Sequence, residues 1–152
     1  MSLLDAVINK VEDGVLREQL QERVDIVLHK IKFMEKIPVS CLDTENASGR
    51  ELQDLIVTAG GELQADPLNA RVVIYCEKEV GILQLMGAVP ALLHKDWPAV
   101  TYSRVYLWED FREPSAQAQS AVDALEDLAE MLYPGYFVFG NEGKTWISFK
   151  TQ

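Results

Sequence analysis

Helix-forming and strand-forming patterns occupy separate stretches of this chain, and that separation limits the folds it can adopt. Apolar residues recur at helical spacing at residues 3–11, from about 14 to 33, and again at 52–59. Short runs rich in β-branched and aromatic residues follow, and one more helical stretch ends at Leu132. Because helices and strands do not strictly alternate, we expect an α+β domain with a mixed or antiparallel sheet instead of a doubly wound parallel one.

The helical stretches have recognisable boundaries. The strongest periodicity follows Gly14 and continues to about Phe33, with one apolar and one charged side. Its expected core stripe is Leu16, Leu20, Val24, Val27, Leu28 and Ile31. Residues 48–51, Ser-Gly-Arg-Glu, fit a capping box, so we expect a third helix to begin there and to end at Gly60-Gly61. Between these two helices, Pro38 and the polar residues 43–48 indicate a connection.

The second half of the chain supplies the expected strands. Residues 71–76 and 101–108 have strand-like composition. Residues 80–95 are open between strand and helix, with 82–86 a possible strand and 88–94 a possible short helix. A helix is expected at 114–132, and residues 136–139 and 145–149 are expected to form a terminal β-hairpin. The prediction is a single domain, residues 1–152, with N-terminal helices and four to five strands covered by helices on one face.

Composition narrows the class of protein. The chain has 152 residues, of which 48% are hydrophobic and 25% charged, as in an ordinary globular domain. Its net charge of −10 disfavours a nucleic-acid partner. No apolar run approaches the length of a membrane span, since the longest, residues 80–93, contains two glycines and a proline. The N-terminus lacks a signal-peptide pattern and Cys41 and Cys76 show no disulfide pattern, so we expect a cytoplasmic protein with reduced thiols.

No motif for cofactor or metal chemistry is present. Gly60-Gly61 follows a helix, whereas a phosphate-binding glycine loop follows a strand and opens a helix. Cys41, Cys76, His29 and His94 are not spaced as metal ligands. A Cys41–His94 nucleophile and base pair is conceivable, but a core thiol and a surface imidazole explain the two residues better. The sequence therefore predicts no catalytic residues, no cofactor and no metal.

Acidic and aromatic residues gather in one part of the sequence. Residues 109–130 hold seven acidic residues and one arginine, and the acids of the expected helix lie away from its apolar stripe. Aromatic residues with arginine often anchor protein interfaces, and acidic rims steer basic partners. The leading hypothesis is a non-catalytic acidic module, of the immunity, antitoxin or inhibitor kind or an accessory subunit, that docks a basic protein. Its partner-binding residues would be Tyr106, Trp108, Glu109, Asp110, Arg112, Asp123, Asp127 and Glu130.

Two alternatives from other classes remain open. In the first, the protein binds a small ligand or is an enzyme, with a pocket lined by Trp97, Tyr102 and Arg104 and with His94 as the acid–base group. In the second, the aromatic residues form a homodimer interface. A deep pocket containing His94 and Arg104 would favour the first alternative, and a flat aromatic patch rimmed by acids would favour the docking module.

Overall fold

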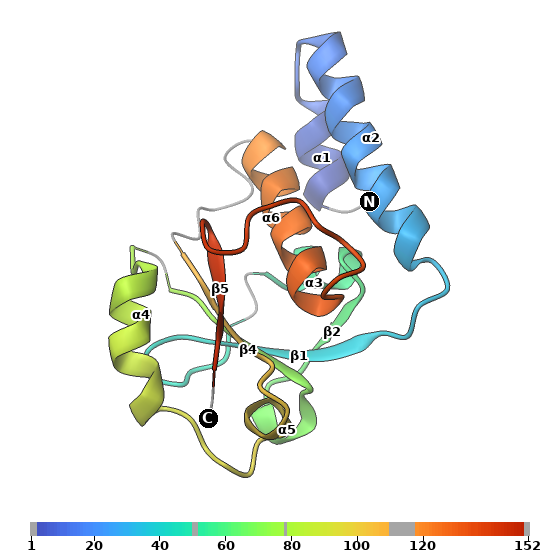
Figure 1. Ribbon diagram of the computed structural model, residues 1–152. Coiled ribbons are helices and arrows are strands. Elements are labelled where there is room, and N and C mark those ends of the chain that lie inside the picture. Colours follow the sequence, from blue (N-terminus) through green and yellow to red (C-terminus); the bar gives the residue numbers. More distant parts are fainter. Residues whose placement is uncertain (1–2, 50–51, 78, 110–117, 151–152) are drawn as a thin grey trace.

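The fold is an α+β arrangement of helices around one mixed sheet. The computed structural model describes residues 3–49, 52–77, 79–109 and 118–150 (Figure 1). The strands are β1 (Ile37–Leu42), β2 (Gly61–Leu63), β3 (Val72–Tyr75), β4 (Val105–Trp108) and β5 (Trp146–Phe149). The helices are α1 (Leu3–Asn9), α2 (Gly14–Ile31), α3 (Gln53–Thr58), α4 (Ile82–Ala88), α5 (Pro98–Thr101) and α6 (Ala118–Leu132), with short 3-10 helices η1 (Pro67–Asn69) and η2 (Val89–Ala91).

The sheet has the order β2-β1-β3-β4-β5. β1 pairs in parallel with β2 and β3, and β3 pairs in parallel with β4. β5 is antiparallel to β4, with Val105 opposite Phe149 and Trp108 opposite Trp146. The sheet was expected to be mixed or antiparallel with four to five strands, and a mixed sheet of five strands agrees with that expectation. Its parallel part is larger than the separated sequence blocks suggested.

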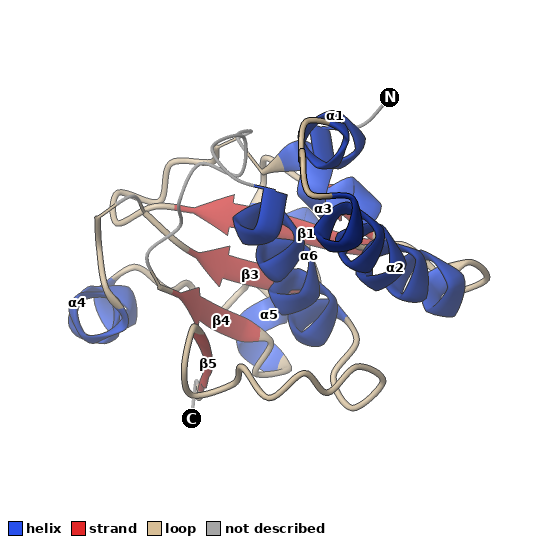
Figure 2. Ribbon diagram, turned by 90° about the horizontal axis from the view of Figure 1, so that it is seen from above, coloured by secondary structure: helices blue, strands red, loops and turns tan. Residues whose placement is uncertain are grey.

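Helices cover both faces of the sheet, which corrects the expectation that one face is covered. Successive residues of β3 enter two different cores: Val72 and Ile74 pack with α1, α2, α3 and α6, while Val73 and Tyr75 pack with α4 and α5. In both views the strands β4 and β5 lie between α4 and α6 (Figures 1 and 2). The reason is topological. Crossovers of one hand that run in opposite directions along a sheet must use opposite faces, and β1→β2 and β3→β4 run in opposite directions.

The long N-terminal helix forms as expected. Asp13 caps α2, because its Oδ1 accepts hydrogen bonds from the amides of Val15 and Leu16 at 3.0 and 3.3 Å. Leu20, Val24, Val27 and Ile31 form its buried stripe. Leu28, which was predicted to belong to that stripe, is 42% exposed, so that assignment is wrong.

Two expectations about β1 and the start of α3 are also wrong. Residues 37–42, expected to be part of a connection, form the buried strand β1. The capping box does not start α3: Ser48 forms an isolated bridge with Leu42, and α3 follows Leu52, which makes no side-chain cap. The end of that helix is as expected, since Gly60 has φ +98 and a Cβ there would lie 2.5 Å from the Tyr133 hydroxyl.

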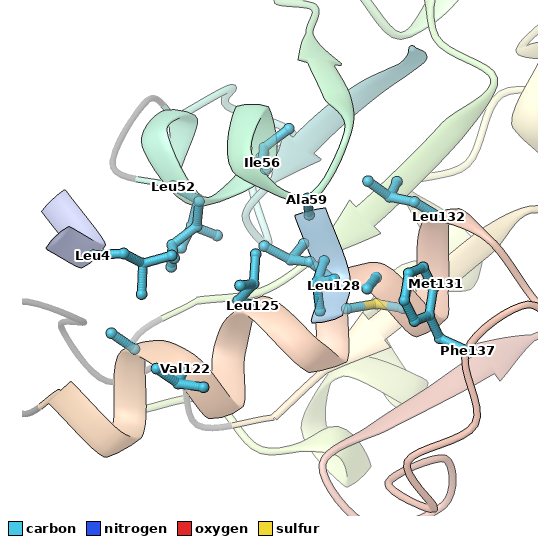
Figure 3. Packing of buried hydrophobic residues seen from close by; sticks show 14 of the residues in the cluster. Leu4, Leu52, Ile56, Ala59, Val122, Leu125, Leu128, Met131, Leu132 and Phe137 are labelled. Carbon is cyan, nitrogen blue, oxygen red and sulfur yellow. The ribbon is translucent and has the colours of Figure 1, made fainter. Parts of the chain in front are cut away.

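The second half decides one open alternative and departs from expectation at two points. Within residues 80–95, where strand and helix were both possible, residues 82–91 are helical, as α4 and η2. The strand predicted over 101–108 is confined to Val105–Trp108, after the short helix α5. The terminal hairpin is absent from the described residues, because β5 pairs with β4 and residues 136–139 lack strand structure. Those residues follow α6 and fold back over it instead, and Phe137 packs in the core beside Met131 (Figure 3).

Candidate functional site

The acidic side of α6 faces the protein interior. Glu126, Asp127 and Glu130 are only 8%, 4% and 5% exposed. The apolar side of the same helix is buried as well, and Figure 3 shows Leu125 and Leu128 reaching from α6 toward Leu52 and Ile56 of the α3 region. α6 is therefore covered on both sides, and three of the acids predicted to lie on its solvent face have partners inside the domain.

Asp127 holds together β4, α6 and the loop before β5. Its Oδ2 accepts from the indole Nε1 of Trp108 at 3.0 Å, and its Oδ1 accepts from Nδ2 of Asn141 at 2.9 Å. Burial raises the pKa of Asp127, while hydrogen bonds from Thr145, Trp108 and Asn141 partly oppose that rise. The Asp127 side chain therefore stabilises the packing of α6 against β4 and the loop before β5.

Glu126 is paired with a cation on another helix. Arg23 of α2 donates to Oε1 of Glu126 at 2.6 Å and, through Nε, to Oε2 at 3.1 Å, and it also contacts Asp123. This pairing raises the pKa of Arg23. Since Arg23 and Glu126 are both largely shielded from solvent, they form a specific link between α2 and α6.

The predicted partner-binding residues do not form one accessible surface. Tyr106, Trp108, Asp127 and Glu130 are buried within the domain, where a docking protein could not reach them. Glu109 is exposed and the Asp123 side chain is half-exposed. Asp110 and Arg112 lie outside the described residues.

The residues of the alternative pocket are also separated. His94 is exposed and its ring lies 4.9 Å from that of Trp97, which packs in the α4–α5 core, and Tyr102 is 74% exposed. Arg104 is directed to the opposite face, where it donates to the carbonyls of Met131 and Leu132 at 3.1 Å. There it caps the C-terminal end of α6, and its Nε donates to the Tyr106 hydroxyl at 2.8 Å. His94 and Arg104 therefore do not share a pocket.

The carboxyl ends of the parallel strands provide a better candidate site. Figure 2 shows the arrowheads of β1, β3 and β4 at the same edge of the sheet. After β1 the chain continues to α3 on one face, and after β3 it continues to α4 on the other face. The space between these two strand ends is a topological switch point, where open α/β sheets bind ligands because the two departing loops leave a crevice.

Polar residues from both loops meet at this switch point. The Thr44 amide and hydroxyl, following β1, donate to Glu77 Oε1, following β3, at 3.1 and 2.8 Å. Asn46, with φ 59, accepts from the Tyr75 hydroxyl at 2.8 Å and donates to the Leu92 carbonyl at 2.8 Å. These two hydrogen bonds tie the loop after β1 to β3 and to the residue that follows η2.

A second carboxylate approaches the same edge from β4. Glu109 directly follows β4, and a Cβ placed on Gly81 would lie 3.2 Å from its Oε1. Gly81 lacks that atom and so admits the carboxylate beside the backbone that precedes α4. Thr44, Glu77 and Gly81 are partly buried and Glu109 is exposed, so oxygen acceptors at this edge are accessible to a ligand that carries donors or positive charge.

The carboxyl-edge site, defined by Thr44, Glu77, Gly81 and Glu109, was missed from the sequence. Thr44 and Glu77 are 33 positions apart and belong to no motif. The available signal was positional: polar residues directly follow the apolar runs that became β1 and β3. In the described part of the chain, no three His, Cys, Asp or Glu side chains are arranged to hold a metal ion.

Comparisons with known proteins give a consistent structural picture. No family model matches the sequence, and no curated protein matches it. An ABC transporter substrate-binding protein from Listeria monocytogenes superposes with a TM-score of 0.62 at 22% identity, over 78% of this chain and 55% of that one. The TroA-like periplasmic binding protein FepB from Veillonella parvula gives 0.60 at 16%, over 82% and 47%. CeuE from Helicobacter pylori, in a nickel–histidine complex, gives 0.61 at 12%, over 88% and 51%.

These likenesses show the fold: the chain resembles about half the length of each structure it matches. They overturn the leading hypothesis of an acidic module that docks a basic protein or a second copy, because the matched folds belong to a substrate-binding protein, a periplasmic binding protein and a protein solved as a nickel–histidine complex. The expectation of a cytoplasmic protein is corrected by the same finding, since FepB is a periplasmic binding protein. Of the helices in the described ranges, none has the length and apolar character needed to cross a membrane.

Proposed function

We propose that this domain binds a small molecule at the carboxyl-edge site. The observation that carries the proposal is the meeting of Thr44 and Glu77 between the ends of β1 and β3, at the switch point of a sheet whose fold resembles substrate-binding proteins. The Thr44 contact orients one oxygen of Glu77. The other oxygen and the Glu109 carboxylate are available to a ligand.

The chemistry of these groups defines the ligand class. A ligand that donates hydrogen bonds or carries positive charge complements Glu77 and Glu109, whereas an anion is repelled by both. The preformed loop around Asn46 lowers the entropy cost of binding, because the acceptors do not have to be ordered by the ligand.

The proposal is tested by thermal-shift screening followed by calorimetry. The panel contains amino acids, polyamines and Ni²⁺ with histidine, the last because CeuE is a nickel–histidine complex. A bound ligand raises the melting temperature of the wild-type protein, since it binds the folded state only. Glu77→Gln retains an oxygen that accepts from Thr44 but removes the negative charge. We therefore expect the affinity for the ligand to fall about tenfold and the rise in melting temperature to become smaller.

Glu18→Gln is the matched control, because it makes the same substitution at an exposed position on α2 that is not part of the carboxyl-edge site. It should keep the wild-type affinity. The proposal fails if no compound in the panel stabilises the protein, or if Glu77→Gln binds the stabilising compound as tightly as Glu18→Gln does.

A further inference from the structure

The C-terminal end of α2 and the turn that follows it expose apolar side chains. Phe33 is 91% exposed, Leu28 is 42% exposed and Met34 is 38% exposed. All three belong to residues 28–36, which end directly before β1. A partner that covers the Phe33 ring would remove a large apolar area from water. The domain itself leaves that area open to a partner.

Basic residues lie among these apolar side chains. The same segment contains three exposed lysines, Lys30, Lys32 and Lys36. Nζ of Lys32 lies 5.4 Å from the centre of the Phe33 ring. Glu35 is the acid of the segment, and its carboxylate lies 3.8 Å from the exposed guanidinium of Arg71, which offsets its charge. Residues 28–36 are therefore positive in a chain whose net charge is −10.

The α2-end patch is defined by Leu28, Lys30, Lys32, Phe33, Met34 and Lys36. A groove of about 320 Å³ adjoins it, toward α1 and α3. Val57 of α3, 48% exposed, extends the apolar area across this groove, and Asp5 of α1 contributes a carboxylate to its lining. Lys32 and Lys36 line the same groove, so the positive charges there outnumber the negative one. The groove widens the apolar area without reversing the sign of the patch.

Lys30 joins the α2-end patch to the segment after α6. Its Nζ donates to the Tyr136 carbonyl at 3.0 Å and lies 5.2 Å from the centre of the Tyr136 ring. Tyr136 is 45% exposed, so a second aromatic ring, with a polar hydroxyl, lies beside the patch. Rings that are apolar at one end and polar at the other are typical of the boundary between a membrane and water.

The α2-end patch and the carboxyl-edge site lie at opposite ends of the sheet. In Figure 2 the turn after α2 leads into the start of β1, at the end of the sheet away from the arrowheads. The 6 residues of β1 separate the two ends, about 20 Å at the usual rise per residue. Charges more than about 10 Å apart in water are largely screened by salt, so Glu77 and Glu109 do not cancel the attraction of the lysines for an anion. A surface that covers the patch also leaves the carboxyl-edge site open.

We propose that the α2-end patch docks on the surface of an anionic lipid bilayer, with Phe33 and Met34 inserted between the headgroups and the lysines beside the lipid phosphates. Lysine suits this position because its stem follows apolar surface while its ammonium group stays in water. Fluid lipid closes around single protruding side chains, whereas a protein interface has a contiguous buried centre. The apolar side chains of the patch are interspersed with lysines, which favours the bilayer. This docking surface is distinct from the carboxyl-edge site and does not depend on the proposed function.

The first test measures sedimentation of the unmodified full chain with vesicles. One set contains phosphatidylcholine alone, and the other contains equal parts of phosphatidylcholine and phosphatidylglycerol. The protein should sediment with the anionic vesicles and stay in solution with the neutral ones, and added salt should release it because salt screens the lysines. Equal sedimentation with both sets, or none with the anionic vesicles, overturns the proposal.

Variants then locate the docking surface. Phe33→Ser should lower the partition coefficient onto anionic vesicles about tenfold, and Lys32→Gln about fivefold. Leu83→Ser is the matched control, because Leu83 is 84% exposed on α4, on the other face of the sheet, and should leave binding unchanged. Circular dichroism confirms that each variant is folded. The proposal is overturned if Phe33→Ser binds as the wild type does, or if Leu83→Ser weakens binding as much as Phe33→Ser.

A fluorescent reporter tests the insertion directly. The three tryptophans of the chain, Trp97, Trp108 and Trp146, are 7%, 3% and 4% exposed. Phe33→Trp therefore adds an indole at an exposed position, and its emission should shift to shorter wavelength when anionic vesicles are added. An unchanged emission from sedimented protein would mean that position 33 stays in water, and the inserted ring would have to be abandoned.

Discussion

Helices α2 and α6 have similar sequence patterns and very different surroundings. Each has an apolar stripe and a charged side. On α2, Glu18, Glu22 and Asp25 are exposed, whereas on α6 the acids Glu126, Asp127 and Glu130 are buried. The periodicity of a helix identifies which side meets the core, but it does not show whether another segment covers the opposite side.

The segments that cover the acidic side of α6 donate hydrogen bonds to its carboxylates. Arg23 pairs with Glu126, Trp108 and Asn141 donate to Asp127, and the segment after α6 folds back so that Phe139 donates to Glu130. Each buried carboxylate thus has at least one donor, as a buried charge requires. A charged stripe on a helix between two layers is therefore a polar network and not a docking surface.

The largest expected difference between α6 and α2 comes from replacing one leucine on each helix. Leu128 of α6 is 0% exposed and Leu28 of α2 is 42% exposed. Leu128→Ala should lower the free energy of unfolding by about 2–5 kcal/mol because it leaves a cavity. Leu28→Ala should cost less than about 1 kcal/mol because solvent fills the space. Urea unfolding measures both, and equal losses would show that the two helices are equally buried.

An aspartate on each helix gives the next largest contrast. Asp127→Ala removes the acceptor of the hydrogen bonds from Trp108, Asn141 and Thr145 and should cost about 1–3 kcal/mol. Asp25→Ala removes only a contact with Gln21 on the exposed side of α2 and should stay within about 0.5 kcal/mol. The near-ultraviolet circular dichroism signal should change in the first variant, since Trp108 loses a partner. If Asp25→Ala costs as much as Asp127→Ala, the exposed and buried acids are energetically alike.

Two arginines show what burial does to an ion pair. Arg23→Ala leaves Glu126, 8% exposed, without its charged partner and should cost about 1–3 kcal/mol. Arg71 lies 3.8 Å from Glu35, and both side chains are more than half exposed, so Arg71→Ala should cost about 0–1 kcal/mol. Added salt should weaken the Arg71 contribution more than that of Arg23. Equal effects would mean that the α2–α6 link behaves as a surface pair.

Helices and strands whose pattern depends only on neighbouring residues could be predicted from the sequence. α2 and β3 were predicted because periodicity and β-branched composition depend only on neighbouring residues. β1 was missed because Pro38 suggests a loop, although proline is tolerated at the start of a strand. Pro38 is the second residue of β1, and its carbonyl accepts from the Arg71 amide at 2.9 Å.

The candidate site was hidden for a different reason. Thr44 and Glu77 meet only because β1 and β3 are adjacent and parallel, a fact that belongs to the strand order. The sequence prediction favoured aromatic residues because they are conspicuous, and the structure places Tyr106 and Trp108 in the core. Spatial adjacency across the sheet, which no spacing in the chain encodes, decides which polar residues form a site.

The smallest expected effect is a pH dependence, and it follows from the position of Asp127. Burial raises the pKa of Asp127 above its ordinary value of 3.8. A group with a higher pKa in the folded state holds its proton more tightly when the chain is folded. Its contribution to stability is therefore fully present below pH 3.8 and is lost as the pH rises through the raised pKa.

The measurement is the difference in unfolding free energy between the wild-type protein and Asp127→Asn, followed by urea denaturation from below pH 3.8 upward. The difference should be most favourable to the wild type at the acidic end and decline as the pH rises. Asp25→Asn, which changes an exposed carboxyl on α2, controls for the loss of one titratable group. A difference that instead grows with pH would show that the hydrogen bonds from Trp108 and Asn141 favour the charged form more than burial disfavours it. The buried acids of α6 would then be held as carboxylates by their donors, and the contrast with α2 would be one of hydrogen bonding and not of burial.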